Sequence, residues 1–94
     1  MSHKTAAELG LILPIVHLNG TSRESLLEDR EKLYTALREA DRALAQAGPN
    51  GRDFYPEPGL MEKAVAQHRR RQATLAGLIA EIEAEAIAID QLNR

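Results

Sequence analysis

The sequence contains no cysteine and no tryptophan, and its aromatic residues are one phenylalanine and two tyrosines. The absence of cysteine excludes a disulfide framework, a thiolate nucleophile and a cysteine metal site. The scarcity of aromatic residues excludes a core filled by large side chains, so leucine, isoleucine and alanine must form it. A thin core of this kind suits helices that pack side by side, often across chain boundaries.

The sequence also lacks a strong charge of either sign. The net charge of −2 argues against a protein that binds nucleic-acid polymers. The apolar stretch 11–18 is interrupted by Pro14 and His17 and is too short to span a bilayer. It has neither the basic region nor the cleavage site of a secretory signal. We therefore expect a cytoplasmic protein that contacts no membrane.

Signatures of catalysis and of cofactor binding are missing as well. There is no P-loop, no Rossmann glycine pattern and no metal-spaced set of histidine and cysteine. The histidines His3, His17 and His68 are scattered, and no nucleophile has a base near it in sequence. We therefore expect a protein that is not an enzyme and needs no cofactor or metal. A small nucleotide hydrolase that uses His17 or His68 is a third, unsupported alternative.

Ninety-four residues form one domain, which we expect to be all-α. Residues 1–21 are assigned to a frayed leader and an extended N-terminal arm, where Pro14 argues against a helix or a central strand. The remainder, 22–94, is predicted to be a helical hairpin. It comprises a helix at about 22–47, a loop at 48–58 and a second helix at about 59–92.

Local signals set the ends of the first helix. Asn19 and Gly20 form a turn signal, and Thr21 with Glu24 matches a capping box at the helix start. At the other end, Gly48 is expected in the left-handed conformation, and the proline that follows cannot continue the helix.

Apolar residues recur along both predicted helices at alternating steps of three and four, as in a coiled coil. In the first helix, where Arg30 fills a gap, they are Leu26, Leu33, Leu37, Ala40, Leu44 and Ala47. In the second helix the stripe is Met61, Val65, His68, Gln72, Leu75, Ile79, Ile82, Ala86 and Ile89. The two stripes predict an antiparallel hairpin in which Leu44 lies near Met61 or Ala64, Arg30 near Gly77 and Ser22 near Glu85.

In this register the last turns of the second helix overhang the start of the first, and the arm 11–18 would cover them. Leu78, Ile87 and Leu92 lie off the stripe, on other sides of the helix. One hairpin cannot bury all of this apolar surface. We therefore expect a homo-oligomeric helical bundle.

The first candidate site precedes the first helix and contains His17, Asn19, Gly20, Thr21, Ser22 and Arg23. A helix start presents unpaired amides and a partial positive charge, which together attract anions. The glycine permits close backbone approach, and the hydroxyl, imidazole and guanidinium groups add hydrogen-bond donors. The alternative is an ordinary N-cap preceded by a turn.

The second candidate is the loop segment that contains Arg52, Asp53, Phe54 and Tyr55. Aromatic rings beside an arginine suit a flat heterocycle that carries a phosphate or a carboxylate. Alternatively, the two aromatic side chains plug the end of the hairpin while Arg52 pairs with Asp53.

The third candidate is His68 with Arg71, which lie three residues apart on one side of the second helix. Polar residues on an apolar stripe often only fix the helix register, and a run of arginines is usually solvated. However, the loop is expected to fold over these two residues. The first candidate lies at the opposite end of the hairpin, so one shared pocket would require a second chain.

The chain reads Val16-His17-Leu18-Asn19-Gly20-Thr21-Ser22, then Asn50-Gly51-Arg52-Asp53-Phe54-Tyr55-Pro56, then His68-Arg69-Arg70-Arg71. Over roughly residues 15–90 this pattern resembles small phage and prophage proteins predicted to be helical hairpins. Its size and architecture are loosely similar to those of phage sponge proteins, helical oligomers that sequester nucleotide signals of bacterial immune systems. The resemblance implies pockets between subunits, built from polar loops and helix ends. The motif of the best-known cyclic-dinucleotide sponges is absent, so the signal stays open.

The leading hypothesis is a phage-type anti-defence protein that binds itself and a small phosphorylated nucleotide-derived signal, and sequesters that signal uncleaved in the bacterial cytosol. The helix start would hold phosphate, the loop aromatics would stack on the base, and the arginines with His68 would supply charge. The main alternative is a structural or adaptor hairpin that binds another protein.

Overall fold

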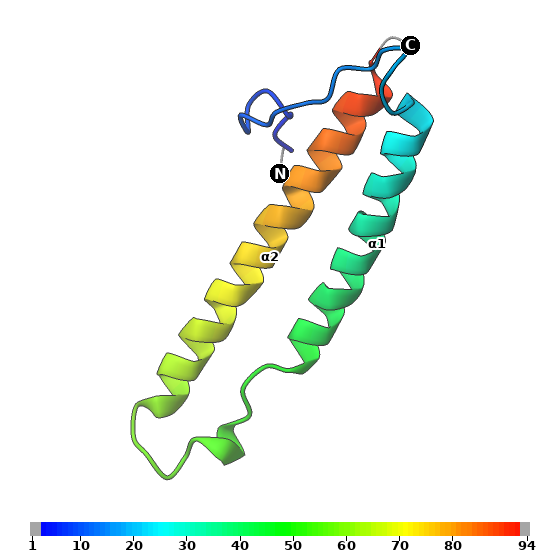
Figure 1. The fold of residues 1–94 in the computed structure, drawn as a ribbon. Helices are drawn as coiled ribbons and strands as arrows, with labels where there is room; N and C mark the ends of the chain where they lie inside the picture. Colours follow the sequence, from blue (N-terminus) through cyan, green and yellow to red (C-terminus); the bar gives the residue numbers. More distant parts are fainter. Residues whose placement is uncertain (1–2, 93–94) are drawn as a thin grey trace.

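The computed structural model describes residues 3–92, and within these residues the regular structure is entirely helical. Helix α1 is Arg23–Gln46, the short 3-10 helix η1 is Gly51–Asp53, and helix α2 is Leu60–Asp90. The two long helices lie side by side and run in opposite directions, forming a rod of 62 × 23 × 21 Å (Figure 1). The predicted all-helical hairpin is confirmed, and both long helices end within two residues of their expected bounds.

Helix α1 begins one residue later than the predicted capping box requires. The N-cap is Ser22, whose backbone is extended and whose Oγ accepts a hydrogen bond from the Ser25 amide at 3.1 Å. The Glu24 carboxylate contacts the neighbouring Arg23 guanidinium. The capping role predicted for Thr21 was therefore wrong, because the adjacent hydroxyl has the N-cap conformation.

A capping box does form nearer the N-terminus, at the same Thr-x-x-Glu spacing. The Thr5 amide donates to Glu8 Oε1 at 2.9 Å, and the Glu8 amide donates to Thr5 Oγ1 at 3.2 Å. The turn ends at Gly10, whose φ of 68° belongs to the left-handed region, with two amides bonded back to the Ala7 and Ala6 carbonyls. Residues 5–10 thus form a turn that is capped at both ends.

This N-terminal turn packs against the last turns of α2 (Figure 1). Ala6 is only 5% exposed and lies beside Ala84 and Ala88 of α2. The cover that was expected from residues 11–18 is therefore supplied in part by the preceding turn. Residues 11–17 have neither helix nor strand.

Glycines at the hairpin end play different roles from those expected. Ala47 is the C-cap of α1, and Gly48 is not in the left-handed conformation. Gly48 instead allows a close approach, because a Cβ built on it would lie 3.1 Å from Nε2 of His68. The left-handed glycine is Gly59, with φ of 83°, at the N-cap of α2.

The register of the hairpin differs from the predicted one. Arg30 faces Glu85, with its terminal nitrogen 2.9 Å from Oε1, rather than Gly77. Two turns away, at the start of α1, Arg23 donates to the Leu92 carbonyl at 3.0 Å, in the same register. The connection between the helices is not a tight turn, so α2 begins beyond the end of α1 and its first turns overhang there (Figure 1).

The predicted stripe of α2 is confirmed, since each of its members is buried or half-buried. In α1 the stripe is offset in the middle. Tyr34 and Asp41 are half-buried, whereas Leu33 is 43% exposed and Ala40 is also exposed. The two arrangements share four half-buried positions, Leu26, Arg30, Leu37 and Leu44, so the stepping pattern could not separate them. The last predicted member, Ala47, is exposed.

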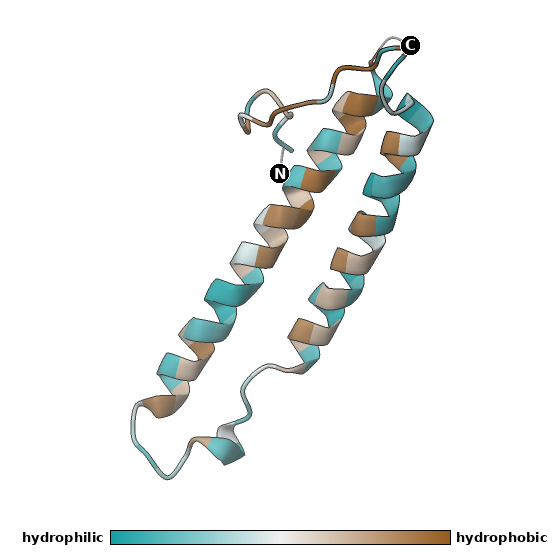
Figure 2. Ribbon diagram, in the orientation of Figure 1, coloured by the Kyte–Doolittle hydropathy of each residue, from teal (hydrophilic) through white to brown (hydrophobic). Residues whose placement is uncertain are grey.

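Little of the molecule is fully buried. Among the described residues the buried hydrophobic side chains are Ala6, Ala84 and Ile89, and apolar residues extend along both helices and the N-terminal segment (Figure 2). The accessible surface is 7276 Å², whereas a compact monomer of 10.4 kDa exposes about 5,400 Å². The radius of gyration is 18.3 Å, against roughly 12 Å for a compact domain of this length. A single hairpin therefore leaves much of its apolar surface in water.

Candidate functional site

The first candidate site forms a hollow of about 340 Å³ at the start of α1. His17, Gly20, Ser22 and Arg23 all contribute to it, whereas Asn19 and Thr21 are exposed outside its lining. The chain turns back here because the Gly20 amide donates to the His17 carbonyl at 3.1 Å.

The His17 imidazole folds over this turn and explains the glycine in it. A Cβ on Gly20 would come within 2.8 Å of His17 Nε2, closer than real Cβ contacts. The imidazole is itself exposed at the edge of the hollow. The sequence therefore builds a tight polar turn with one accessible ring beside a helix N-terminus.

Two polar side chains of this hollow already have structural partners. Ser22 Oγ accepts from the Ser25 amide and also donates to Ser25 Oγ at 3.1 Å. Arg23 donates to the Leu92 carbonyl and, at 3.4 Å, to Glu24 Oε1. These contacts stabilise the helix start and tie it to the end of α2. Because Ser22 and Arg23 are already hydrogen-bonded within the chain, the exposed His17 imidazole is the side chain of this hollow best placed to contact a ligand.

The second candidate is the loop around η1. Asn50 caps η1, and its Oδ1 accepts from the Arg52 amide at 2.9 Å and from Arg52 Nε at 3.4 Å. Arg52 makes no salt bridge with Asp53 in the part of the chain that the structure describes, so the intra-loop ion pair is not present. The guanidinium is thus oriented by an amide and keeps its charge unneutralised.

The two aromatic side chains of the loop differ in environment. Phe54 is half-buried, in keeping with a plug for the hairpin end, whereas Tyr55 is 80% exposed. Asp53 is exposed beside them. The tyrosine ring and the adjacent arginine therefore offer a stacking surface and a cation to a ligand from outside.

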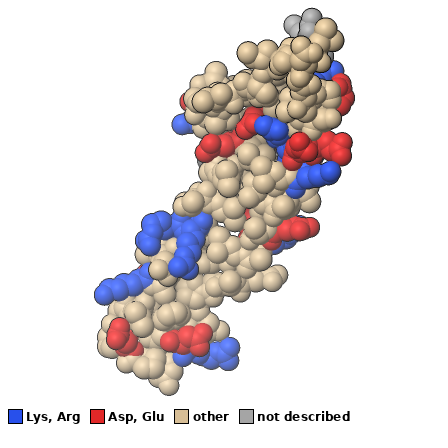
Figure 3. All heavy atoms as spheres, in the orientation of Figure 1, with Lys and Arg blue, Asp and Glu red and all other residues tan. Residues whose placement is uncertain are grey.

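The two residues of the third candidate differ in exposure. His68 is half-buried and packs against Gly48, so the loop does cover it. Arg71, like Arg69 and Arg70, is exposed. A group of lysine and arginine side chains gathers over the lower part of α2, while acidic side chains concentrate nearer the upper end (Figure 3). His68 therefore positions the loop, and the arginines form a cationic surface next to it.

The first candidate and the other two lie at opposite ends of the rod (Figure 1). The 24 residues of α1 between them span about 36 Å along the helix axis. Within one chain these residues therefore make two separate surfaces.

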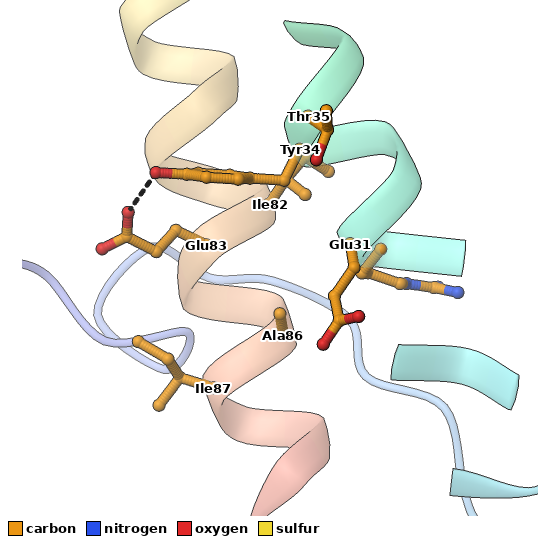
Figure 4. A pocket seen from close by; sticks show the side chains of 8 residues that line it. Glu31, Tyr34, Thr35, Ile82, Glu83, Ala86 and Ile87 are labelled. Carbon is orange, nitrogen blue, oxygen red and sulfur yellow. Dashed lines mark hydrogen bonds between the residues drawn. The ribbon is translucent and has the colours of Figure 1, made fainter. Parts of the chain in front are cut away.

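A feature that the sequence did not indicate lies between the two long helices. It is a groove of about 380 Å³, hereafter the interhelical groove (Figure 4). Its lining consists of Arg30, Glu31, Tyr34, Thr35, Ile82, Glu83, Ala86 and Ile87. Carbon atoms dominate this lining, and Ile87 is 54% exposed at its edge.

Tyr34 shapes the interhelical groove. Its ring reaches from α1 toward α2, where the hydroxyl donates to Glu83 Oε2 at 3.4 Å (Figure 4). Its half-buried position was missed because the stripe predicted for α1 placed Leu33 at the interface. The presence of a tyrosine four residues after Arg30, in a chain with so few aromatics, was the available signal.

Two further searches concern ions and membranes. Among residues 3–92, no three or more histidine and acidic side chains are arranged to hold a metal ion. Neither long helix, within the described residues, has an apolar stretch long enough to cross a membrane.

Comparison with known proteins gives no assignment: no family model matches the chain, and neither the curated proteins nor the solved structures yield a significant match.

Proposed function

We propose that this chain is a self-associating helical hairpin that binds a small phosphorylated, nucleotide-derived molecule and holds it without cleaving it. The observation that carries the proposal is the pair Arg52 and Tyr55. The tyrosine is 80% exposed, and the adjacent guanidinium has an amide rather than a carboxylate as its hydrogen-bond partner. An exposed ring beside an unneutralised cation suits a base that carries a phosphate.

The cationic surface of α2 supports the same proposal. Arg69, Arg70 and Arg71 are exposed, and they follow His68, which contacts the loop at Gly48. The loop and these arginines are therefore at the same end of the hairpin. A phosphorylated ligand stacked on Tyr55 would have several positive charges on the neighbouring helix.

Self-association is supported by the surface that one chain leaves uncovered. The accessible surface exceeds that of a compact monomer of this mass by about 1,900 Å². A standard protein interface buries about 800 Å² on each partner. The surplus is thus large enough for a chain to contact more than one neighbour in a helical bundle.

Association would also bring the separate candidate surfaces together. If a neighbouring copy packs antiparallel, the His17 turn of one chain comes beside the loop of the next. Figure 3 shows several acidic side chains, with cationic ones among them, toward the upper end of the rod, and an antiparallel neighbour would bring these acidic groups toward the basic part of α2. We therefore infer a ligand site that two copies share, with phosphate near His17 and the base on Tyr55.

The biological setting we propose follows from the resemblance of the sequence pattern to phage helical hairpins. A holder of nucleotide signals acts by lowering their free concentration, so it needs affinity and abundance rather than a catalytic group. We propose that the chain serves as an anti-defence protein in the cytosol of an infected bacterium.

The proposal is tested by following the thermal unfolding of the purified protein with a panel of cyclic and linear nucleotides. Binding to the folded state raises the unfolding temperature as ligand exceeds its dissociation constant. The ligand is then recovered from the heat-denatured complex and identified by mass. Stabilisation by one compound that is recovered unchanged supports sequestration, and recovery of a cleaved product indicates a hydrolase.

A pair of arginine variants locates the site. Arg52→Ala should abolish the stabilisation, whereas Arg42→Ala, which removes the same charge from an exposed position on α1, should leave it unchanged. Tyr55→Ala should weaken binding without altering helicity or oligomer size, because its side chain is 80% exposed in the free chain. Equal effects of both arginine variants would contradict a specific site at the loop.

A second candidate function, a hairpin that binds another protein, is favoured by the apolar interhelical groove (Figure 4). An amphipathic helix could lay its apolar face along such a groove. A protein of this kind would show no stabilisation by any nucleotide. A stable oligomer without a nucleotide ligand would therefore shift the assignment to this second function.

A further inference from the structure

Residues 11–18 present two different sides. Leu11, Leu13 and Val16 are half-buried against the rest of the chain. Ile12, Ile15 and Leu18 are 94%, 81% and 90% exposed. Three large apolar side chains are thus directed into solvent from a short segment that its own chain already holds on the other side.

The interhelical groove is an apolar surface of matching kind that its own chain leaves open. Ile82 and Ala86 of α2 line it, and Ile87 stands at its edge (Figure 4). The residues that line it belong to the two long helices. His3, Lys4 and Leu9 of the same chain share a separate hollow with Glu83 and Ile87 and do not line the groove.

We propose that the exposed side of residues 11–18 in one copy packs into the interhelical groove of a second copy. The proposal rests on the self-association inferred above but does not depend on any ligand. It concerns a different neighbour from the antiparallel copy of the shared ligand site, because the groove and the loop lie toward opposite ends of the rod. It names the segment that one subunit supplies and the surface that the other provides.

The dimensions of the two surfaces agree. From Ile82 to Ile87 the groove extends about 7–8 Å along α2. Ile12 and Ile15 are three residues apart, a spacing that places two side chains on one face of a polyproline-II-like backbone about 9 Å apart. Two neighbouring isoleucines can therefore occupy the groove at the same time, with Leu18 beyond its end.

The charges also agree. Glu31 and Glu83 stand at the rim of the groove, and the Glu83 carboxylate is bonded to the Tyr34 hydroxyl. The segment 11–18 contains no acidic residue, and its one ionisable side chain is His17. Residues 11–18 would therefore place apolar side chains in the groove and no negative charge beside its two carboxylates.

A second copy of the chain is the partner that would cover both the exposed side of residues 11–18 and the interhelical groove. Each chain carries one exposed apolar segment and one open groove, so each copy can donate to one neighbour and accept from another. Such head-to-tail contacts close into a symmetric ring when the rotation between subunits permits. A foreign helix in the groove would leave the three exposed side chains of residues 11–18 in water.

Disulfide trapping tests the proposal directly, because the natural chain contains no cysteine. Ile15→Cys and Ile87→Cys are made in two differently tagged chains, which are co-expressed and mildly oxidised. A disulfide that joins the two tags is intermolecular by construction. The matched control replaces the second variant with Ala66→Cys, an exposed position on α2 about 30 Å from the groove.

The proposal predicts a mixed disulfide with Ile87→Cys and its loss in the Ala66→Cys control. The double variant Ile12→Ser with Ile15→Ser should also elute as a smaller species, while Leu33→Ser, which changes an exposed leucine outside the groove, should keep the parent size. An oligomer of parent size that forms no such disulfide would overturn this contact yet leave self-association standing. A monomeric parent protein would overturn both, and the nucleotide panel reports on ligand binding independently.

Discussion

The contact between Arg30 and Glu85 is the sharpest test of the hairpin register. Arg30 approaches Glu85 Oε1 through both Nε, at 3.1 Å, and a terminal nitrogen, at 2.9 Å. The side chains are 25% and 18% exposed, so water screens the pair only partly. Glu28 and Lys32 provide a control pair on α1, since their side chains are 66% and 73% exposed.

The expected energies follow from these exposures. Exposed pairs contribute roughly 0.2–1 kcal/mol, whereas breaking a buried pair costs about 3–5 kcal/mol. The partly buried pair should lie between these limits, so Glu85→Ala should lower the free energy of unfolding by roughly 1–3 kcal/mol. The coupling energy between Arg30 and Glu85 should be about 1–2 kcal/mol, within the range measured for residues in direct contact. For Glu28 and Lys32 it should be about 0.3–0.5 kcal/mol.

The assay is a double-mutant cycle with Arg30→Ala, Glu85→Ala and the double variant, measured by urea unfolding and far-ultraviolet circular dichroism. Protein concentration is held fixed, because association makes apparent stability depend on it. A coupling energy no larger than that of the control pair would refute the reasoning. It would indicate that the two side chains do not meet in solution and that the helices pack in another register.

Four further variants test local parts of the account. Ser22→Ala should cost about 1 kcal/mol of unfolding free energy through loss of the N-cap, whereas Thr21→Ala should change it little, as thermal unfolding would show. Gly77→Ala should stabilise the protein by about 0.5–1 kcal/mol in the same measurement, because a Cβ there meets nothing within 4 Å and glycine weakens a helix interior. Hydrogen bonds from the Thr5 amide and hydroxyl lower the pKa of the Glu8 carboxyl below 4.5. The stabilisation from this turn should therefore be present at neutral pH and lost as the pH falls through the folded pKa. Titration of Glu8 by nuclear magnetic resonance should show a higher pKa in Thr5→Ala.

The helical hairpin itself was predictable from the sequence, because a repeating stripe and its ends are local properties. The stripe from Met61 to Ile89 is buried or half-buried as expected, and the loop begins where Gly48 and Pro49 interrupt the first helix. The register was not predictable, since the stripes of both helices repeat and several offsets pair apolar residues equally well. The long connection, rather than the stripe, brings Glu85 to Arg30.

Capping motifs show why a matching pattern does not settle a local structure. The Thr-x-x-Glu spacing occurs at Thr5 and again at Thr21, and the structure forms the capping box at Thr5 alone. At Thr21 the neighbouring Ser22 competes for the N-cap position and bonds the Ser25 amide. The sequence contains both alternatives, and backbone conformation selects one.

The candidate site was predictable in its parts and not in its assembly. Gly20 was singled out for close approach, and the approaching group is the His17 ring. Tyr55 is exposed and Phe54 is half-buried, although the sequence pattern gave the same expectation for both aromatic side chains. These differences depend on contacts across the hairpin end, which no local pattern contains.

Native mass spectrometry of the purified protein with the nucleotide panel tests the central claim most directly, because one spectrum gives both subunit number and ligand mass. The account predicts an oligomer that retains a nucleotide-derived compound of unchanged mass and loses it on Arg52→Ala. A monomer, or an oligomer that retains none of the compounds, would contradict it.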